Sequence, residues 1–133
     1  MNESLNVPVP EGPAGLLLSR DLIFTSKVTG TASALGHKVI VAGNVALASA
    51  MLGRWTPVAV FADLAAGDLV APANLARFRE LIPASTPFLA FGSHVDTDAL
   101  ASARAAGCDP VMPRSKFTLE LPELIRTYFA PRP

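Results

Sequence analysis

Short apolar runs alternate with amphipathic stretches five times along this chain. The apolar runs cover residues 15–19, 37–43, 57–63, 87–93 and 110–113. Parallel strands need a long crossover between them, usually a helix, so this alternation predicts an α/β domain with a parallel sheet. The strands are almost continuously apolar, which predicts a sheet covered on both faces. We therefore expect a flavodoxin-like, doubly wound five-stranded sheet of order 2-1-3-4-5 with five helices, in a three-layer sandwich.

Residues typical of helix ends bracket the amphipathic stretches. The first predicted helix runs from Asp21 to about Leu35, before Gly36. Asn44 and Asp96 are expected to cap the second and fourth helices, and Pro122 to open the fifth. In the third helix, between Pro72 and Pro83, the residues expected to face inward are Leu75, Phe78, Leu81 and Ile82.

Length and composition indicate one domain and exclude several functions. The 133 residues fit a single domain over 14–130, a flexible leader over 1–13 that is rich in proline, and a tail over 131–133. No apolar run is long enough to span a membrane, and the leader lacks the pattern of a signal peptide. Because 11 basic residues balance 11 acidic ones without a basic cluster, nucleic-acid binding is not expected.

Cysteine usage points to a reducing compartment. Cys108 is alone, so it forms no internal disulfide, and no Cys/His cluster has metal-ligand spacing. We expect a cytoplasmic protein in which Cys108 is a buried structural thiol.

Chemistry-bearing residues follow the strands at their carboxyl ends. In doubly wound sheets the site lies beyond these ends, between the first and third strands. The residues delivered there are Ser19, Arg20, Asp21, Asp63, Gly92, Ser93, His94 and Arg114. A hydrolytic triad of Ser93, His94 and Asp96 is disfavoured, because neighbouring residues rarely point at one another and no nucleophile-elbow motif is present.

Three segments in order resemble response-regulator receiver domains. "LLLSRDLIFTSKV" resembles the first strand and helix of that family, "PVAVFADLAAG" the strand that ends in the phosphoacceptor aspartate, and "FLAFGSHVDTDALASARAAGCD" the fourth strand and helix. The resemblance covers residues 14 to 130 and implies a two-component signalling module rather than an enzyme.

The resemblance assigns a role to each residue at the sheet edge. Asp63 matches the phosphoacceptor, and Ser19 and Arg20 fall where the family has its Mg²⁺-binding acid pair. The hydroxyl position falls on Gly92, with Ser93 one residue later. Arg114 takes the place of the lysine, and Val111 that of the switch aromatic.

These departures point to a pseudo-receiver. Arg20 puts a cation where Mg²⁺ needs an anion, so we expect no metal and no cofactor. We also expect one or both of Arg20 and Arg114 to pair with Asp63, which would fix the domain in one state without phosphate. Asp21 is expected to be either the N-cap or a first-turn acid of the first helix.

The resemblance implies action through protein–protein contact. The expected surface combines the fourth helix, fifth strand and fifth helix, and it binds a kinase, an output protein or a second copy in a homodimer. The exposed candidates on the fifth helix are Glu123, Arg126 and Thr127. Two alternatives remain open: an atypical phosphoacceptor that is phosphorylated on Asp63, with Asp21 replacing the acid pair and Mg²⁺ bound, and a small-molecule site at the same strand ends.

Overall fold

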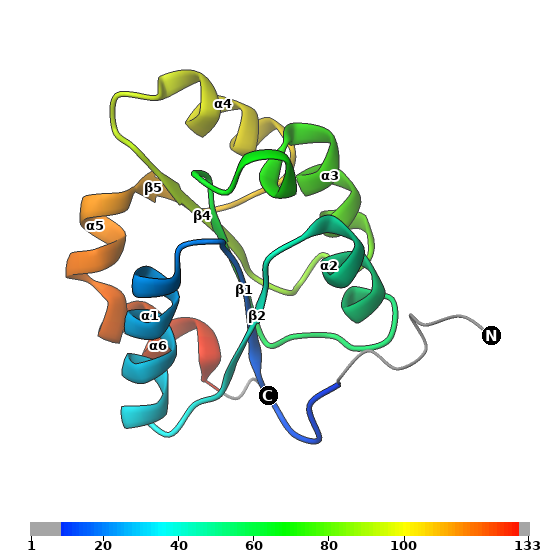
Figure 1. Cartoon of the computed structure of the whole chain (residues 1–133), viewed down its shortest axis with the longest axis vertical. Helices are drawn as coiled ribbons and strands as arrows, with labels where there is room; N and C mark the ends of the chain where they lie inside the picture. The colour runs from blue at the N-terminus through cyan, green and yellow to red at the C-terminus, as the bar shows by residue number, and fades with distance from the viewer. Residues whose placement is uncertain (1–8, 131–133) are drawn as a thin grey trace.

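A five-stranded parallel sheet runs through the molecule with helices on both faces (Figure 1). The computed structural model describes residues 9–130. The strands are β1 (Gly15–Leu18), β2 (Val39–Ala42), β3 (Val60–Asp63), β4 (Phe88–Gly92) and β5 (Val111–Pro113). Their order is β2-β1-β3-β4-β5, which confirms the predicted fold and topology.

Three of the helices, α1 (Leu22–Ala34), α2 (Val45–Leu52) and α4 (Thr97–Ala105), begin after a capping side chain that is recognisable in the sequence. The other α-helices of the described chain are α3 (Pro72–Glu80), α5 (Arg114–Leu119) and α6 (Leu121–Phe129). The carboxylates of Asp21 and Asp96 and the amide oxygen of Asn44 each accept a backbone N–H three residues ahead. Such caps satisfy amides that have no partner inside the helix.

Two expectations about the helices were wrong. The described chain has six α-helices rather than five, because α5 forms between β5 and the predicted last helix, and a 3₁₀-helix, η2 (Gly67–Val70), precedes α3. Helix α5 was not predicted because six residues are too few to show a helical period in the sequence. Its buried residue is Phe117. Leu81 does not face inward but is 39% exposed, because α3 has already ended at Glu80.

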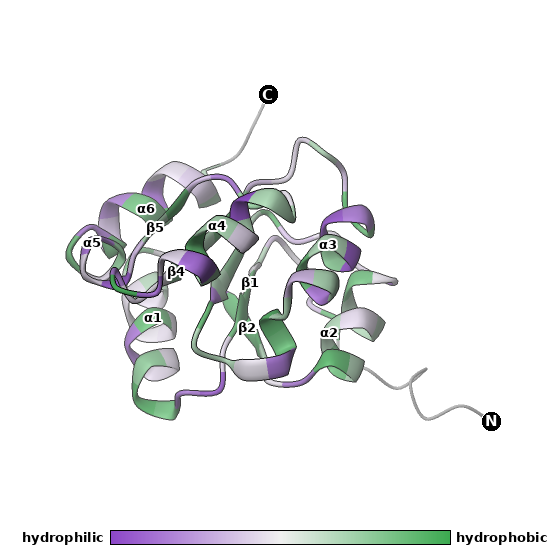
Figure 2. Ribbon diagram, turned by 90° about the horizontal axis from the view of Figure 1, so that it is seen from above, coloured by the Kyte–Doolittle hydropathy of each residue, from purple (hydrophilic) through white to green (hydrophobic). Residues whose placement is uncertain are grey.

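The strand side chains divide between two cores, one on each face of the sheet. One core lies against α2, α3 and α4 and contains Leu16, Leu18, Val60 and Ala62. The other lies against α1, α5 and α6 and contains Leu17 and Phe61. This alternation follows from the two-residue period of a strand. In Figure 2, seen from above, hydrophilic segments lie on the helices and loops around the strands. Both faces are therefore covered, as the apolar strands predict.

The last helix closes against the first strand. Gly15 begins β1, and the ring of Phe129, at the end of α6, occupies the space where any other residue would place its Cβ. The same ring meets His37 edge-on, with 5.7 Å between ring centroids. A larger residue at Gly15 would displace this ring, so it is the close approach and not the backbone conformation that favours glycine here.

Cys108 is buried, as predicted, and should be unreactive in the folded protein. Burial raises the pKa of its thiol from 9.0 to about 12, while the charge of Arg79 acts in the opposite direction. Since the thiolate is the nucleophile, we expect a thiol reagent at pH 8 to label the native chain far more slowly than the chain unfolded in guanidinium. Because the sequence has one cysteine, the label reports on Cys108 alone. Equal labelling rates would contradict a closed core at α4 and β4.

The ends of the expected domain fall partly outside the described residues. Residues 1–8 of the expected leader and the tail over 131–133 lie there, whereas residues 9–13 are in neither helix nor strand. None of the helices within residues 9–130 is long and apolar enough to cross a membrane.

Candidate functional site

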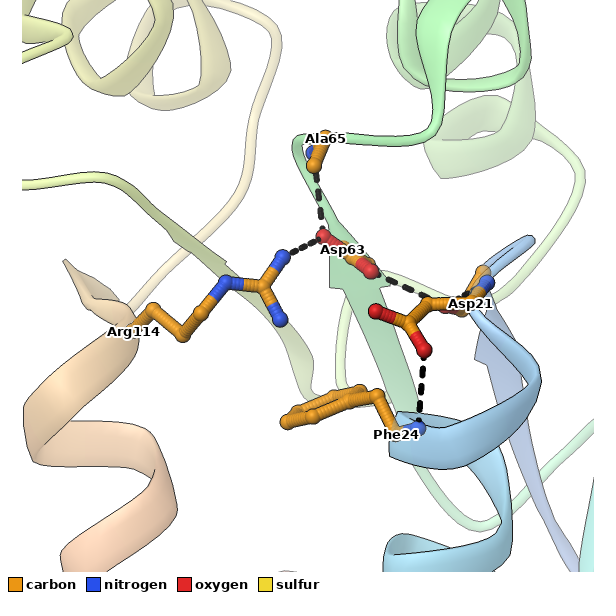
Figure 3. Close-up of polar contacts among 6 residues, drawn as sticks. Asp21, Phe24, Asp63, Ala65 and Arg114 are labelled. Atoms are coloured by element: carbon orange, nitrogen blue, oxygen red, sulfur yellow. Dashed lines mark hydrogen bonds and ion pairs between the residues drawn. The ribbon is translucent and has the colours of Figure 1, made fainter.

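The carboxylate of Asp63 is the centre of the polar cluster at the carboxyl edge of the sheet (Figure 3). Asp63 ends β3 and is 1% exposed. One oxygen accepts a hydrogen bond from the Ser19 hydroxyl at 2.9 Å. The other accepts the Ala65 N–H at 3.0 Å and an Arg114 guanidinium N–H. Both oxygens of this buried carboxylate are therefore engaged.

Arg114 is held by two aromatic rings as well as by the carboxylate. It begins α5 directly after β5, and its guanidinium carbon lies 4.8 Å from the centre of the Phe24 ring and 5.3 Å from that of Phe91. A planar guanidinium suits such stacking and leaves its N–H groups free to donate at the edge. The expected pairing of Asp63 with an arginine is thus present for Arg114.

Arg20 does not pair with Asp63, so of the two arginines expected to do so singly or together, Arg114 makes the contact. The Arg20 guanidinium donates to the Gly43 carbonyl at 2.7 Å and pairs with the Asp68 carboxylate at 2.7 Å. Successive side chains of an extended segment point to opposite sides, so Ser19 enters the pocket while Arg20 turns toward the neighbouring loops. Arg20 thereby links the loops that follow β1, β2 and β3.

The donor set of this pocket does not fit a magnesium ion. Mg²⁺ requires hard oxygen ligands, mainly carboxylates and water. Asp21 is the one carboxylate beside Asp63 in the segment after β1, and its Oδ1 already accepts the Phe24 N–H at 2.9 Å as the α1 cap. Ser19 and Arg20 stand at the acid-pair positions, so these positions offer a hydroxyl and a guanidinium and no carboxylate. Among residues 9–130, no three His, Cys, Asp or Glu side chains lie together as a metal would require.

The remaining predicted positions lie around the pocket without joining the Asp63 cluster. Gly92 is buried at the end of β4, and a Cβ there would lie 3.1 Å from that of Leu64. Ser93 is exposed, and its hydroxyl accepts the Val95 N–H at 3.4 Å. Val111 is half-buried on β5 and packs against the core on the α2–α4 side.

The loop after β4 is not arranged as a triad. The Asp96 carboxylate accepts the Ala99 N–H at 3.1 Å as the α4 cap, and His94 is exposed. This matches the expectation of a polar loop that enters a capped helix.

Sequence reasoning missed three contributors to the site. Phe24 and Phe91 are recognisable as core residues, but nothing in their spacing reveals a guanidinium between them. Asp68, the partner of Arg20, lies five residues after Asp63 and carries the complementary charge, which is the sequence clue that was available.

Comparisons with known proteins resolve the fold. No family model and no curated protein matches this sequence. A response regulator from Thermotoga maritima is 23% identical, with 88% of this chain and 97% of that chain covered and a TM-score of 0.72. A CheY-like receiver domain protein from Methanospirillum hungatei is 15% identical, with 86% and 91% covered and a TM-score of 0.74.

A third similar structure carries a modified aspartate. It is a response regulator from Burkholderia pseudomallei with a phosphorylated aspartic acid, a calcium ion and citrate. The identity is 17%, with 90% of this chain and 67% of that chain covered and a TM-score of 0.72. The chain therefore has the fold of response-regulator receiver domains.

Proposed function

We propose that this chain is a receiver-like signalling module of two-component type that acts by protein–protein contact and does not undergo Mg²⁺-dependent phosphorylation. The observation that carries the proposal is the Asp63 carboxylate, with one oxygen bound by Ser19 and the other by Ala65 and Arg114. A carboxylate held in this way is already neutralised by a fixed cation. The pocket thus contains its own substitute for the charge that a metal would supply.

Phosphoryl transfer to Asp63 would need two rearrangements. The Arg114 guanidinium would have to leave the oxygen it occupies, and the Asp21 carboxylate, whose Oδ1 caps α1, would have to bring its other oxygen to a metal. Catalysis of this reaction depends mainly on positioning and on charge neutralisation around the phosphoryl oxygens. In this pocket the cation, Arg114, is already bound to the Asp63 carboxylate and is therefore not placed to neutralise phosphoryl oxygens.

The signalling surface proposed for this module is the face of α4, β5 and the C-terminal helices, with a kinase, an output protein or a second copy as partner. Glu123, Arg126 and Thr127 are exposed on α6, and the Glu123 and Arg126 side chains pair with each other. Surface pairs of this kind contribute little to stability and are available to a partner.

Intact-mass spectrometry tests the proposal. The purified chain is incubated with acetyl phosphate and Mg²⁺, beside an Asp63→Asn variant and an ordinary receiver domain as positive control. We expect no phosphoryl adduct on either form of this chain under conditions that label the positive control. An adduct on the wild type that is lost in Asp63→Asn would overturn the proposal and establish the phosphoacceptor alternative.

A further inference from the structure

Helices α3 and α4 pack side by side (Figure 1). Two adjoining hollows lie between them. The inner hollow has a volume of about 250 Å³ and the outer one about 360 Å³. Pro72 and Ser102 line both, so the two hollows adjoin, and we call them together the α3–α4 groove. Its walls are mostly apolar; Leu64, Val70 and Leu75 line the inner part, and Ala73, Ala76 and Ala105 the outer part.

One charged side chain lines this groove. Asp98 lies in the first turn of α4 and borders the inner hollow, and no other lining residue carries a charge. Within residues 9–130 its carboxylate has no hydrogen-bond or ion-pair partner, unlike Asp63 and Asp68. An apolar groove with a free carboxylate at its inner end is complementary to a cation on an aliphatic stem.

A lysine side chain has that chemistry. Its four-carbon stem packs on apolar surface while its ammonium remains at a polar group. The groove also continues outward beyond Asp98 along small alanine side chains, which let another backbone approach closely. This extension exceeds what a lone amine would occupy and favours a segment of polypeptide.

We infer that the α3–α4 groove docks a segment of a protein partner that places a lysine side chain against Asp98. The inference rests on the proposed function, in that it assigns one contact surface to a module that acts through protein–protein contact. This groove is distinct from the face of β5 and the C-terminal helices.

The groove shares its inner wall with the Asp63 pocket. Leu64 follows Asp63 directly and fills the space beside Gly92, and Gly67 lies against the Arg20 guanidinium. A partner segment in the groove therefore contacts the same loop that carries Asp68, the partner of Arg20.

The experiment is an amide NMR titration of the full chain with the capped tripeptide acetyl-Ala-Lys-Ala-amide. The comparison peptides replace lysine with norleucine or with glutamate. We expect the lysine peptide to shift the amides of Gly67, Asp98, Ala99 and Ser102, and to bind more tightly than the norleucine peptide. The glutamate peptide should bind more weakly than both, because its charge is repelled by Asp98.

Matched variants isolate the carboxylate. Asp98→Asn should lower the affinity for the lysine peptide by about threefold, which is the range expected of an exposed ion pair. The lysine peptide should then bind no more tightly than the norleucine peptide. Glu11→Gln, at an exposed residue ahead of β1 and outside the groove, removes the same charge and should leave the binding of all three peptides unchanged. Ser102→Leu should block the groove for all three peptides.

Three results would overturn the inference. These are equal binding of the lysine and norleucine peptides, unchanged binding in Asp98→Asn, or shifts confined to residues outside the groove. Butylammonium alone binding as tightly as the lysine peptide would show that a free amine is the occupant, which overturns a protein source. A phosphoryl adduct on Asp63 is measured separately, so failure of the proposed function and failure of this inference are told apart.

Discussion

Replacing Arg114 by methionine is expected to lower the free energy of unfolding by about 2–4 kcal/mol. Methionine retains an unbranched stem to pack on Phe24 and Phe91, so the change removes the charge and leaves most of the packing. The Asp63 carboxylate, 1% exposed, then loses its cation. Breaking a fully buried pair costs about 3–5 kcal/mol, and the 32% exposure of the Arg114 side chain reduces this figure. Urea unfolding followed by circular dichroism measures the change.

Arg20→Met is the matched control for this prediction. It removes the same charge from a pair whose side chains are 41% and 72% exposed, so we expect a loss below about 1 kcal/mol. Adding Asp63→Asn to Arg114→Met should restore part of the lost stability, because the uncompensated charge is gone. Equal effects of Arg114→Met and Arg20→Met would show that the Arg114–Asp63 pair has no special structural role.

Phe117→Ala is expected to destabilise the protein by about 3–5 kcal/mol, the range for a large aromatic side chain removed from a core. Phe117 is fully buried and stacks on Phe91 with 3.9 Å between centroids, and it also meets Phe24 and Phe61. It is the buried residue of α5, so its loss should release that helix and with it Arg114. Thermal or urea unfolding gives the stability change.

The control lies on the same helix. Leu119, at the end of α5, is 82% exposed, and Leu119→Ala should change the free energy of unfolding by less than about 0.5 kcal/mol. A similar loss in both variants would mean that α5 contributes to stability through its helical backbone and not through Phe117.

The sheet was predictable because its determinants are local. Each strand lies in an apolar run that is recognisable from its own residues, without knowledge of the strands beside it. Each parallel connection also requires a long crossover, here a helix, between two such runs. The caps at Asp21, Asn44 and Asp96 were equally readable, since a cap acts on an amide three residues away. Strand ends were less certain; β3 begins at Val60 rather than at Pro57.

The partners at the site depend on distances in space that the sequence does not contain. Arg20 and Arg114 both flank the strand ends, yet one meets Asp68 and the other Asp63. That choice is set by the alternation of Ser19 and Arg20 at the end of β1 and by the approach of the loops at Gly43 and Asp68. The aromatic rings that hold Arg114 come from α1 and β4, which are far apart in the chain.

The contact between Gly15 and Phe129 bears on how the chain matures during synthesis. β1 is synthesised well before α6, which carries the ring that covers the first residue of β1. Until α6 emerges, the face of β1 beneath that ring is open to water and to other nascent chains. The packing of β1 is therefore completed only after α6 has been synthesised, and the earlier segments remain incompletely packed until then.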